Sequence, residues 1–283
     1  MKIKKLFALG LVAVMAVSAF TACGKEDKKT AEVIEIELTN EEYAFGVDKT
    51  QPELLEQVND FIAEIKDNGT FEEICNRYFG DGEPKGVTSA KLDESKDQLV
   101  VATNAAFEPF EYIKGDTYYG IDMEIAAALA EKLGKELVIQ NMDFDAVCLA
   151  VGQQKCDIAM AGLTVKEDRK EYVTFSDSYY SASQKLIVVS GDDKFADCKD
   201  AASVEAILKT FGTDVKVGVQ NGTTGQFYCE GDADWGFEGF GFKTVAYKNG
   251  SLAVQDLLNG NVDYVIIDSA PAKCITEAIN EMQ

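Results

Sequence analysis

Short apolar runs alternate with amphipathic segments along most of this chain. Several runs of five or six residues are rich in valine and isoleucine, which is typical of buried strands: 99–103, 136–140, 215–219 and 262–267. Between them, apolar residues recur every three or four positions, which predicts helices over 123–134, 144–154, 203–211, 251–259 and 271–282. Strands that alternate with helices predict an α/β fold with largely parallel sheets.

The first third of the chain shows a different pattern. Residues 33–38 alternate apolar and acidic side chains, which predicts a strand with one wet face, and 42–47 is a second extended piece. Residues 52–82 predict two amphipathic helices joined by a turn. The stretch 80–98 is polar, with glycine, proline and many charges, and is the one clear internal linker.

The N-terminus carries a targeting signal. Three lysines precede about fifteen uncharged and mostly apolar residues, so 1–22 is expected to be a signal peptide rather than part of the fold. The letters TACG around Cys23 resemble a bacterial lipobox, in which the cysteine becomes lipidated after cleavage. The alternative is a plain secretory signal with an incidental cysteine. Residues 23–32 then form a charged tether, and lipidation would anchor the protein to the membrane.

Charge and cysteine content exclude some classes of function. With 49 acidic and 27 basic residues the chain has a formal charge of −22, which argues against nucleic acid as a partner. There is no histidine and no CxxC pair, so no metal site or other cofactor is expected. Six cysteines follow Cys23, and export permits disulfides without requiring them. We expect Cys148 to be a buried thiol and leave a pairing of Cys198 with Cys229 open; the others are Cys75, Cys156 and Cys274.

Four constellations carry candidate chemistry. Arg169, alone, would be a surface arginine; Thr223–Thr224 and Asp268, alone, would be helix caps; Phe107, alone, would be a core residue. Together they describe a receptor for a zwitterion. An arginine fork and a helix N-terminus can hold a carboxylate, an aspartate can hold an ammonium, and aromatic faces can sandwich the part between. This combination matches an α-amino acid.

The same motifs resemble the polar amino-acid solute-binding proteins of ABC transporters, the family-3 bacterial extracellular binding proteins. The resemblance extends over nearly all of 33–283 and rests on four motifs in the family's order: ATNAAFEPFEY, GIDMEIAAALAEKLG, GLTVKEDRKEYVTFSDSYY and LLNGNVDYVIIDSAPA. It implies a two-lobed periplasmic-binding-protein fold (type II, Venus-flytrap) that binds its ligand between the lobes.

The resemblance also implies roles for single residues. Arg169, helped by Thr164 and the Thr223–Thr224 region, would grip the ligand's α-carboxylate. Asp268, with Gly162 and Thr164, would hold the α-ammonium.

Four further positions follow from the resemblance. Phe107 and Phe144 would stack on the ligand, and Ala161 would lie beside it. Asn104 stands where the family often places an aspartate that reads the ligand's side chain. A neutral residue there weakens the case for a lysine-like ligand without excluding arginine.

The order of the segments departs from the family. Family members normally begin at the equivalent of Leu99 and end with a segment that here comes first, at 42–82. We therefore expect a circularly permuted chain in which the linker 80–98 joins the family's usual ends. Lobe 1 would comprise 41–182, and lobe 2 would comprise 33–40 with 183–283. Hinges would lie near 40–42 and 181–183.

The expected function is capture of a polar α-amino acid outside the cell, closure of the lobes, and docking on a transporter permease as a membrane-tethered monomer. One rival is an enzyme on the same fold, such as a dehydratase, but no histidine and no nucleophile beside a base are present, and no additional cleft carboxylate suggests itself. Another rival is a sensor, which would normally carry a signalling domain. The loop 231–242, rich in glycine and aromatic residues, receives no role.

Overall fold

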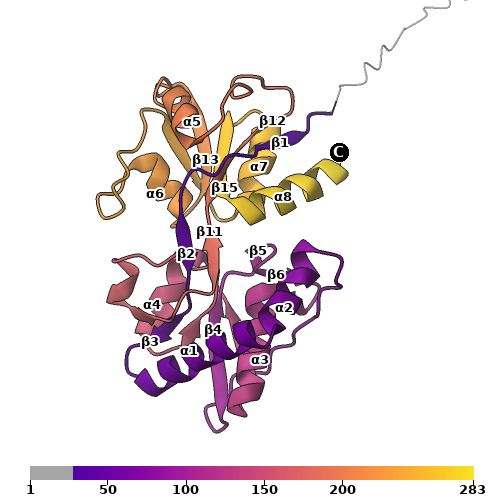
Figure 1. The fold of residues 1–283 in the computed structure, drawn as a ribbon, viewed down its shortest axis with the longest axis vertical. Helices are drawn as coiled ribbons and strands as arrows, with labels where there is room; N and C mark the ends of the chain where they lie inside the picture. Colours follow the sequence, from indigo (N-terminus) through magenta and orange to yellow (C-terminus); the bar gives the residue numbers. More distant parts are fainter. Residues whose placement is uncertain (1–27) are drawn as a thin grey trace, which may run out of the picture.

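The structure is a computed structural model and describes residues 28–283. The predicted signal peptide, Cys23 and the first residues of the tether lie outside the described part. The described chain forms two lobes that lie one above the other in Figure 1, with two strands running between them. Within this part, no helix combines the length and the apolar character that crossing a bilayer requires.

Lobe 1 is built on a five-stranded mixed sheet. Its order is β10 (Val173–Phe175), β3 (Gly46–Asp48), β9 (Ile158–Ala159), β4 (Gln98–Thr103) and β8 (Glu136–Asn141). Strand β4 runs parallel to β8 and β9, as expected for strand–helix–strand units, whereas β3 runs antiparallel to both its neighbours. The remaining elements of the lobe are α1 (Pro52–Asp67), α2 (Thr70–Phe79), the small sheet β5 (Ala106–Phe107), β6 (Glu111–Lys114) and β7 (Thr117–Tyr119), α3 (Ile121–Leu133), the 3₁₀ helices η1 (Phe144–Ala146) and η2 (Arg169–Glu171), and α4 (Val147–Gly152).

Lobe 2 has a five-stranded sheet of its own. Its order is β1 (Ala31–Ile34), β12 (Gln184–Val189), β15 (Tyr264–Asp268), β13 (Lys216–Gln220) and β14 (Lys243–Tyr247). Its helices are α5 (Ala201–Leu208), α6 (Thr224–Glu230), α7 (Gly250–Leu258) and α8 (Ser269–Glu281). Strands β13, β14 and β15 are parallel, so their carboxyl ends share one edge, which faces lobe 1 (Figure 1).

The strand predicted over 33–38 is displaced toward the N-terminus. It pairs antiparallel with β12 from Ala31 to Ile34, so it includes the last two residues assigned to the tether. The N–H of Ile36 donates to the carbonyl of Ile34 at 2.8 Å, and this tight local turn ends the ladder although the apolar–acidic alternation continues. Leu38 then donates its N–H to Gln184 at 2.9 Å, which holds the segment against lobe 2.

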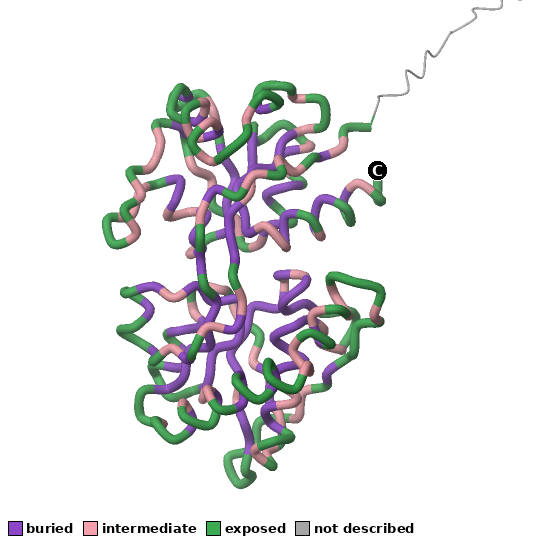
Figure 2. Tube along the Cα trace, in the orientation of Figure 1, coloured by how far each residue is buried: buried purple, intermediate pink, exposed green. Residues whose placement is uncertain are grey.

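Two antiparallel strands connect the lobes. They are β2 (Glu41–Tyr43) and β11 (Tyr180–Ala182), and Tyr43 lies opposite Tyr180 while Glu41 lies opposite Ala182. Figure 2 shows buried residues concentrated in the two sheets, while the crossing strands carry both buried and exposed residues. The extended piece predicted over 42–47 is therefore two strands, because Tyr43 pairs in the crossing ladder and Gly46 begins the next strand in lobe 1.

The two predicted N-terminal helices are confirmed as α1 and α2. The α1 residues spaced at three and four, from Leu54 to Ile65, are buried against lobe 1, because this spacing places them on one face of the helix. Arg77 of α2 donates to the buried carboxylate of Glu124 on α3 at 2.8 Å, which fixes α2 against the lobe.

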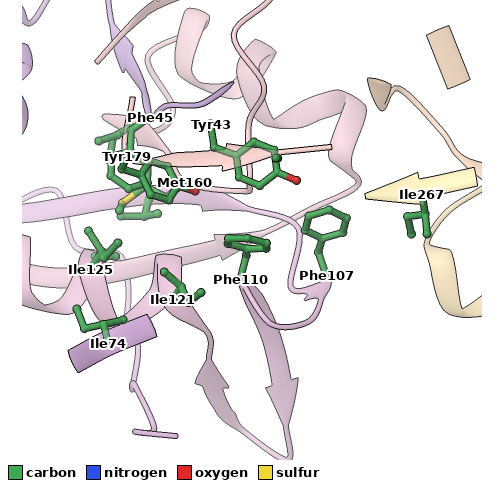
Figure 3. Packing of buried hydrophobic residues seen from close by; sticks show 14 of the residues in the cluster. Tyr43, Phe45, Ile74, Phe107, Phe110, Ile121, Ile125, Met160, Tyr179 and Ile267 are labelled. Atoms are coloured by element: carbon green, nitrogen blue, oxygen red, sulfur yellow. The ribbon is translucent and has the colours of Figure 1, made fainter. Parts of the chain in front are cut away.

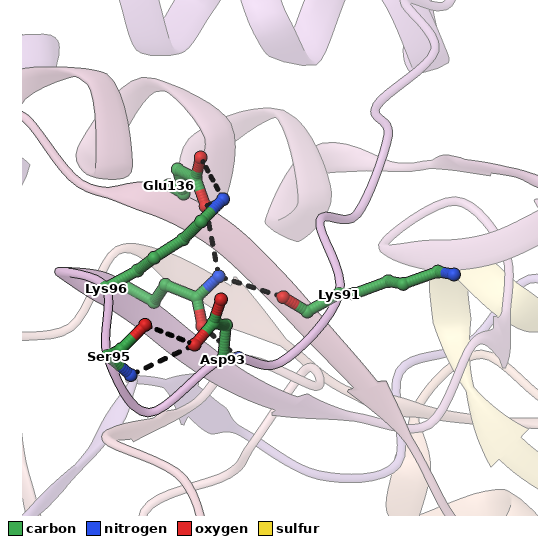
Figure 4. Close-up of polar contacts among 6 residues, drawn as sticks. Lys91, Asp93, Ser95, Lys96 and Glu136 are labelled. Atoms are coloured by element: carbon green, nitrogen blue, oxygen red, sulfur yellow. Dashed lines mark hydrogen bonds and ion pairs between the residues drawn. The ribbon is translucent and has the colours of Figure 1, made fainter.

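The linker after α2 lies on the surface of lobe 1 and returns the chain to β4. Val87 is buried and forms an isolated bridge with Tyr118. Close to β4, the carboxylate of Asp93 accepts hydrogen bonds from Ser95, and the Lys96 ammonium lies 3.0 Å from Glu136 on β8 (Figure 4). These contacts hold the linker to the sheet edge.

All six described cysteines are free thiols. Cys148 is buried, as predicted, and burial raises its pKa. Cys198 and Cys229 are not joined, so the pairing that the sequence left open is absent from this structure.

Candidate functional site

The predicted site residues gather where the carboxyl ends of the two sheets face each other. From lobe 1, Asn104 follows β4, and the segment from Ala161 to Thr164 follows β9. From lobe 2, Thr223–Thr224 follows β13 and Asp268 is the last residue of β15. In open α/β sheets this edge is where ligands bind. The two lobes are in direct contact here, so the structure represents a closed arrangement.

Arg169 provides the positive charge of the site. It begins the 3₁₀ helix η2 and is 9% exposed. One guanidinium nitrogen, Nη1, donates to the Thr164 carbonyl at 2.6 Å, and Nη2 donates across the interface to the Gly222 carbonyl at 3.0 Å. The guanidinium carbon lies 5.2 Å from the centre of the Phe144 ring. Among the described residues no carboxylate lies within ion-pair distance of Arg169, so this charge is free to receive an anion.

Hydroxyl groups from both lobes meet beside Arg169. The Thr224 hydroxyl donates to the Thr164 hydroxyl at 3.2 Å, and Thr164 donates to the Glu41 carboxylate at 2.8 Å. Thr223, by contrast, is the N-cap of α6 and donates its hydroxyl to the Gln220 carbonyl at 2.8 Å. The Thr223 hydroxyl is therefore engaged within its own loop, and Thr224 is the residue that reaches the opposite lobe.

Asp268 lies across the interface and is 4% exposed. It is the N-cap position of α8, yet its side chain makes no capping bond. Instead its carboxylate accepts a hydrogen bond from the Tyr43 hydroxyl of the crossing strand at 2.5 Å. Burial, and then the charge of Glu41, raise the pKa of Asp268 to about 7. A cation placed beside Asp268 would lower this pKa again, because it stabilises the ionised carboxylate.

The aromatic and glycine positions shape the lobe 1 wall. Phe107 is buried and stacks on Phe110, whose ring meets that of Tyr43 edge-on (Figure 3). Gly162 has a φ of +53°, and a Cβ there would come within 2.9 Å of the Phe107 ring. Glycine is thus required both by the backbone conformation and by the close approach of the ring. Its neighbour Ala161 is 1% exposed.

Asn104 links the two lobes. It is 7% exposed, donates its amide to the Met142 carbonyl at 2.7 Å, and accepts from the Gln220 side chain of lobe 2 at 3.2 Å. The structure therefore brings Asn104 into the interface, where its neutral side chain is held by protein partners on both sides.

Sequence reasoning missed Glu41 on the crossing strand β2. Glu41 is 3% exposed and accepts hydrogen bonds from Thr39, Thr164 and Gln184 at 2.6–2.9 Å. The sequence signal was weak, since it is only one acidic residue at the start of an extended piece near a predicted hinge. The expectation that the cleft offers no additional carboxylate is wrong, because long-range pairing of β2 with β11 carries Glu41 into the site.

Two further buried carboxyl groups lie behind the lobe 1 wall. Asp122 accepts the Gly162 N–H at 2.9 Å and the Tyr179 hydroxyl at 2.6 Å, and burial raises its pKa to about 7. Glu111 is fully buried, neither of its oxygens has a partner among residues 28–283, and burial raises its pKa well above the ordinary value. Glu41 and Asp268 are the buried acids at the interface itself, beside the buried cations Arg169 and Lys166. A ligand that brings an ammonium group to Asp268 would favour the ionised form of that carboxylate.

Metal ligands are not grouped in this region. Over the residues that the structure describes, no cluster of three or more Cys, Asp or Glu side chains could hold a metal ion.

Comparisons with known proteins identify relatives of this chain. The sequence model of the bacterial extracellular solute-binding proteins, family 3, matches residues 99–270. The "Arginine-binding extracellular protein ArtP" of Bacillus subtilis is 32% identical over 70% of this chain and 71% of its own length. Other curated relatives are covered over only 58% and 64% of their length.

Solved structures of similar proteins belong to the same group of amino-acid-binding proteins. "An ancestral arginine-binding protein bound to arginine" is 34% identical and matches with a TM-score of 0.54 over 65% of this chain and 75% of its own. The ancestral amino acid-binding protein AncCDT-1, described as a precursor of cyclohexadienyl dehydratase, is 27% identical with a TM-score of 0.54 over 74% and 78% of the two chains. Both comparisons concern the two-lobed fold described above.

Proposed function

Because this chain belongs to the bacterial extracellular solute-binding proteins, family 3, we propose that it captures a polar α-amino acid between its lobes for an ABC importer. The observation that carries the proposal is the pair of opposed groups at the interface. Arg169 of lobe 1 presents a guanidinium without a carboxylate partner in the described chain, and Asp268 of lobe 2 presents a buried carboxylate. An α-amino acid supplies the complementary charges on one carbon atom.

The roles follow from this polarity. The ligand's carboxylate would replace the carbonyl contacts of Arg169 and take a further hydrogen bond from Thr224. The ligand's ammonium would displace the Tyr43 hydroxyl from Asp268 and reach the Thr164 hydroxyl. Phe107 and Phe144 would flank the ligand, and Ala161, Gly162 and Thr223 would shape the walls around it. Every assignment is testable by substitution.

Arginine is the ligand we propose first. Relatives in two comparisons are named for binding arginine, and the buried carboxylate of Glu41 offers a hydrogen-bond acceptor at the interface in addition to Asp268. Asn104 accepts a hydrogen bond and carries no charge, which suits a delocalised guanidinium better than a compact ammonium.

The order of elements supports a circularly permuted member of the family. The family match begins at Leu99, while β1, β2, β3, α1 and α2 precede it and pack into both lobes. We propose that 41–182 forms lobe 1, that 33–40 with 183–283 forms lobe 2, and that the linker 80–98 joins the family's usual ends. The crossing strands β2 and β11 then serve as the hinges.

The location of the protein is extracytoplasmic, as the family description states. We propose in addition that Cys23 is lipidated and anchors the protein to the cell membrane, that the protein is a monomer, and that its closed form docks on the permease. The charged stretch between Cys23 and β1 would act as the tether.

An enzyme is the second candidate, since one structural relative is described as a precursor of a dehydratase and three buried carboxyl groups here have raised pKa values. Binding is favoured because the compared relatives are otherwise named as binding proteins.

A thermal-shift screen of residues 24–283 against the twenty amino acids, cystine and ornithine tests the proposal. A ligand that binds only the folded state raises the melting temperature by mass action. We expect the largest shift with L-arginine. No shift with any amino acid would contradict the proposal, and conversion of the added amino acid by purified protein would favour the enzyme.

A further inference from the structure

The loop 231–242 and Lys166 form a contact between the lobes that none of the ligand-binding roles above explains. The loop belongs to lobe 2 and connects α6 to β14. Lys166 belongs to lobe 1 and lies between the site residues Thr164 and Arg169. We propose that Lys166 and Asp232 form a cross-lobe ion pair that sets ligand affinity by stabilising the closed arrangement, an inference that rests on the proposed function.

The loop is built to present one carboxylate. Asp232 and Phe237 exchange two backbone hydrogen bonds of 2.9 Å, which closes a tight turn between them. Within the turn, the N–H groups of Asp234 and Trp235 donate to one carboxylate oxygen of Asp232, at 3.0 and 3.3 Å. This leaves the second oxygen, Oδ2, for Lys166, whose ammonium lies 3.0 Å away.

Aromatic packing fixes the loop to its own lobe. Phe237 and Phe240 both meet the ring of Tyr228 on α6, with ring centres 5.3 and 5.2 Å apart. The Phe240 N–H also donates to the Cys229 carbonyl at 3.0 Å. The loop therefore moves with lobe 2 when the lobes separate, and Asp232 moves away from Lys166.

Lys166 is buried to a degree that lysine rarely reaches without paired charge. Its side chain is 4% exposed, and its ammonium lies 2.8 Å from Asp168 and 4.5 Å from the centre of the Phe227 ring. Asp168 belongs to the same lobe and is 54% exposed, so it stays with Lys166 in an open arrangement. Asp232 and Phe227 belong to lobe 2, so these two contacts exist only when the lobes are closed.

A second ion pair across the interface provides a matched control. Lys248 of lobe 2 lies 3.4 Å from Asp143 of lobe 1, but the two side chains are 76% and 65% exposed. An exposed pair contributes little because water solvates and screens both charges. The comparison therefore separates a buried cross-lobe ion pair from cross-lobe charge in general.

The relation between closure and affinity is quantitative. A ligand that contacts both lobes binds only the closed arrangement, so its apparent dissociation constant rises as the closed fraction falls. We expect Lys166→Met and Asp232→Asn each to weaken L-arginine binding about tenfold, which corresponds to about 1.4 kcal/mol. Methionine keeps an apolar side chain without the ammonium, and asparagine keeps the Oδ1 acceptor for the turn.

The decisive experiment is a double-mutant cycle read by calorimetric titration with L-arginine. We expect the double variant Lys166→Met/Asp232→Asn to bind no more weakly than either single variant, because each change alone removes the same interaction. The control Lys248→Met should change affinity less than twofold. Single variants that bind like wild type, or effects that simply add, would overturn the proposal.

A ligand-free readout separates this inference from the proposed function. The ion pair stabilises the closed arrangement of the protein itself, so the coupling between Lys166 and Asp232 should also appear in the melting temperatures of the same four proteins. If wild type binds no amino acid but the melting temperatures still couple, the proposed function fails and the ion pair stands. If the changes in melting temperature are additive and the affinities are unchanged, the proposed role of the ion pair is refuted.

Trp235 offers a direct optical signal. It is the chain's single tryptophan and its backbone N–H binds Asp232. L-arginine should therefore change the intrinsic fluorescence of wild type, with a smaller change in Asp232→Asn. An equal change in both proteins would count against a role of Asp232 in closure, and Trp235→Phe should abolish the signal and so identify its source.

Discussion

Replacing Arg169 by methionine tests the anion side of the proposed site. Arg169 is one of two arginines in the chain, and its two terminal nitrogens each donate to a backbone carbonyl, at 2.6 and 3.0 Å. When a ligand binds, its carboxylate would replace these two neutral carbonyl acceptors of Arg169 with a charged acceptor. Methionine keeps an apolar side chain but removes the guanidinium, whose carbon lies over the Phe144 ring.

The expected loss of affinity follows from the two hydrogen bonds. A hydrogen bond to a charged group contributes about 1.5–3 kcal/mol. Because ligand binding replaces two existing bonds, we take the lower value for each, which gives a loss of about 3 kcal/mol or roughly a hundredfold in the dissociation constant. Calorimetric titration with L-arginine measures this directly. Binding within fivefold of wild type would refute the assignment of the carboxylate to Arg169.

The other arginine provides the control. Arg77 holds the buried carboxylate of Glu124 in lobe 1, and nothing connects it to the interface. Arg77→Met should lower the free energy of unfolding by about 1–3 kcal/mol, since it removes one hydrogen-bond donor from the buried carboxylate of Glu124. Affinity should be unchanged. The two variants thus separate loss of the fold from loss of the site.

Three further predictions concern pH and the lobe 1 wall. Asp268 has a pKa raised to about 7 and would bind the ligand's ammonium only when ionised. The dissociation constant for L-arginine should therefore rise by up to about tenfold per pH unit as the pH falls from 7 to 5. A dissociation constant that does not change with pH over this range would contradict the assignment. Asp122 has a pKa raised from 3.8 to about 7, so between these pH values its carboxyl is protonated in the folded state and ionised in the unfolded state. The free energy of unfolding of wild type should therefore fall as the pH rises from 4 to 7. In Asp122→Asn this fall should be less steep. Gly162→Ala should lower the free energy of unfolding by about 1–2 kcal/mol because of the left-handed φ, and should weaken ligand binding because the new methyl group would contact Phe107. Gly134 has a φ of +69° and open space around it, so Gly134→Ala should show the backbone strain alone. Equal ligand affinities of the two variants would contradict the contact with Phe107.

The α/β architecture was predictable because local patterns determine it. The strands β4, β8, β13 and β15 are short apolar runs, and α1 shows its buried face in the spacing of Leu54 to Ile65. The amino-acid class of ligand was predicted from Arg169, Asp268 and their flanking motifs, and the family match supports the family on which that prediction drew. Which of these residues contact a ligand remains a prediction.

The residues that sequence reasoning missed depend on long-range packing. Glu41 enters the site only because β2 pairs with β11, 139 positions away at Ser181↔Glu42, and no local pattern reports that pairing. Glu111 begins the short strand β6, and its burial depends on the lobe core behind it.

The loop 231–242 shows the same limit. Its glycines and aromatic residues indicate an irregular segment, but its contact with Lys166 requires two lobes in register. Lys166 itself lies in a charged run, Lys166 to Glu171, which in sequence resembles any solvated surface. The end of β1 at Ile34 was also invisible, since a single backbone turn stops the ladder within an unbroken alternation.

The most direct test of the central claim compares L-arginine with agmatine, which lacks only the α-carboxylate, in one calorimetric titration of residues 24–283. Both keep an amine for Asp268, so the comparison isolates the contact with Arg169. We predict that L-arginine binds at least about a hundredfold more tightly than agmatine, because only L-arginine has a carboxylate that the Arg169 guanidinium can bind. Equal affinity for the two compounds would contradict an amino-acid site built on Arg169 and Asp268.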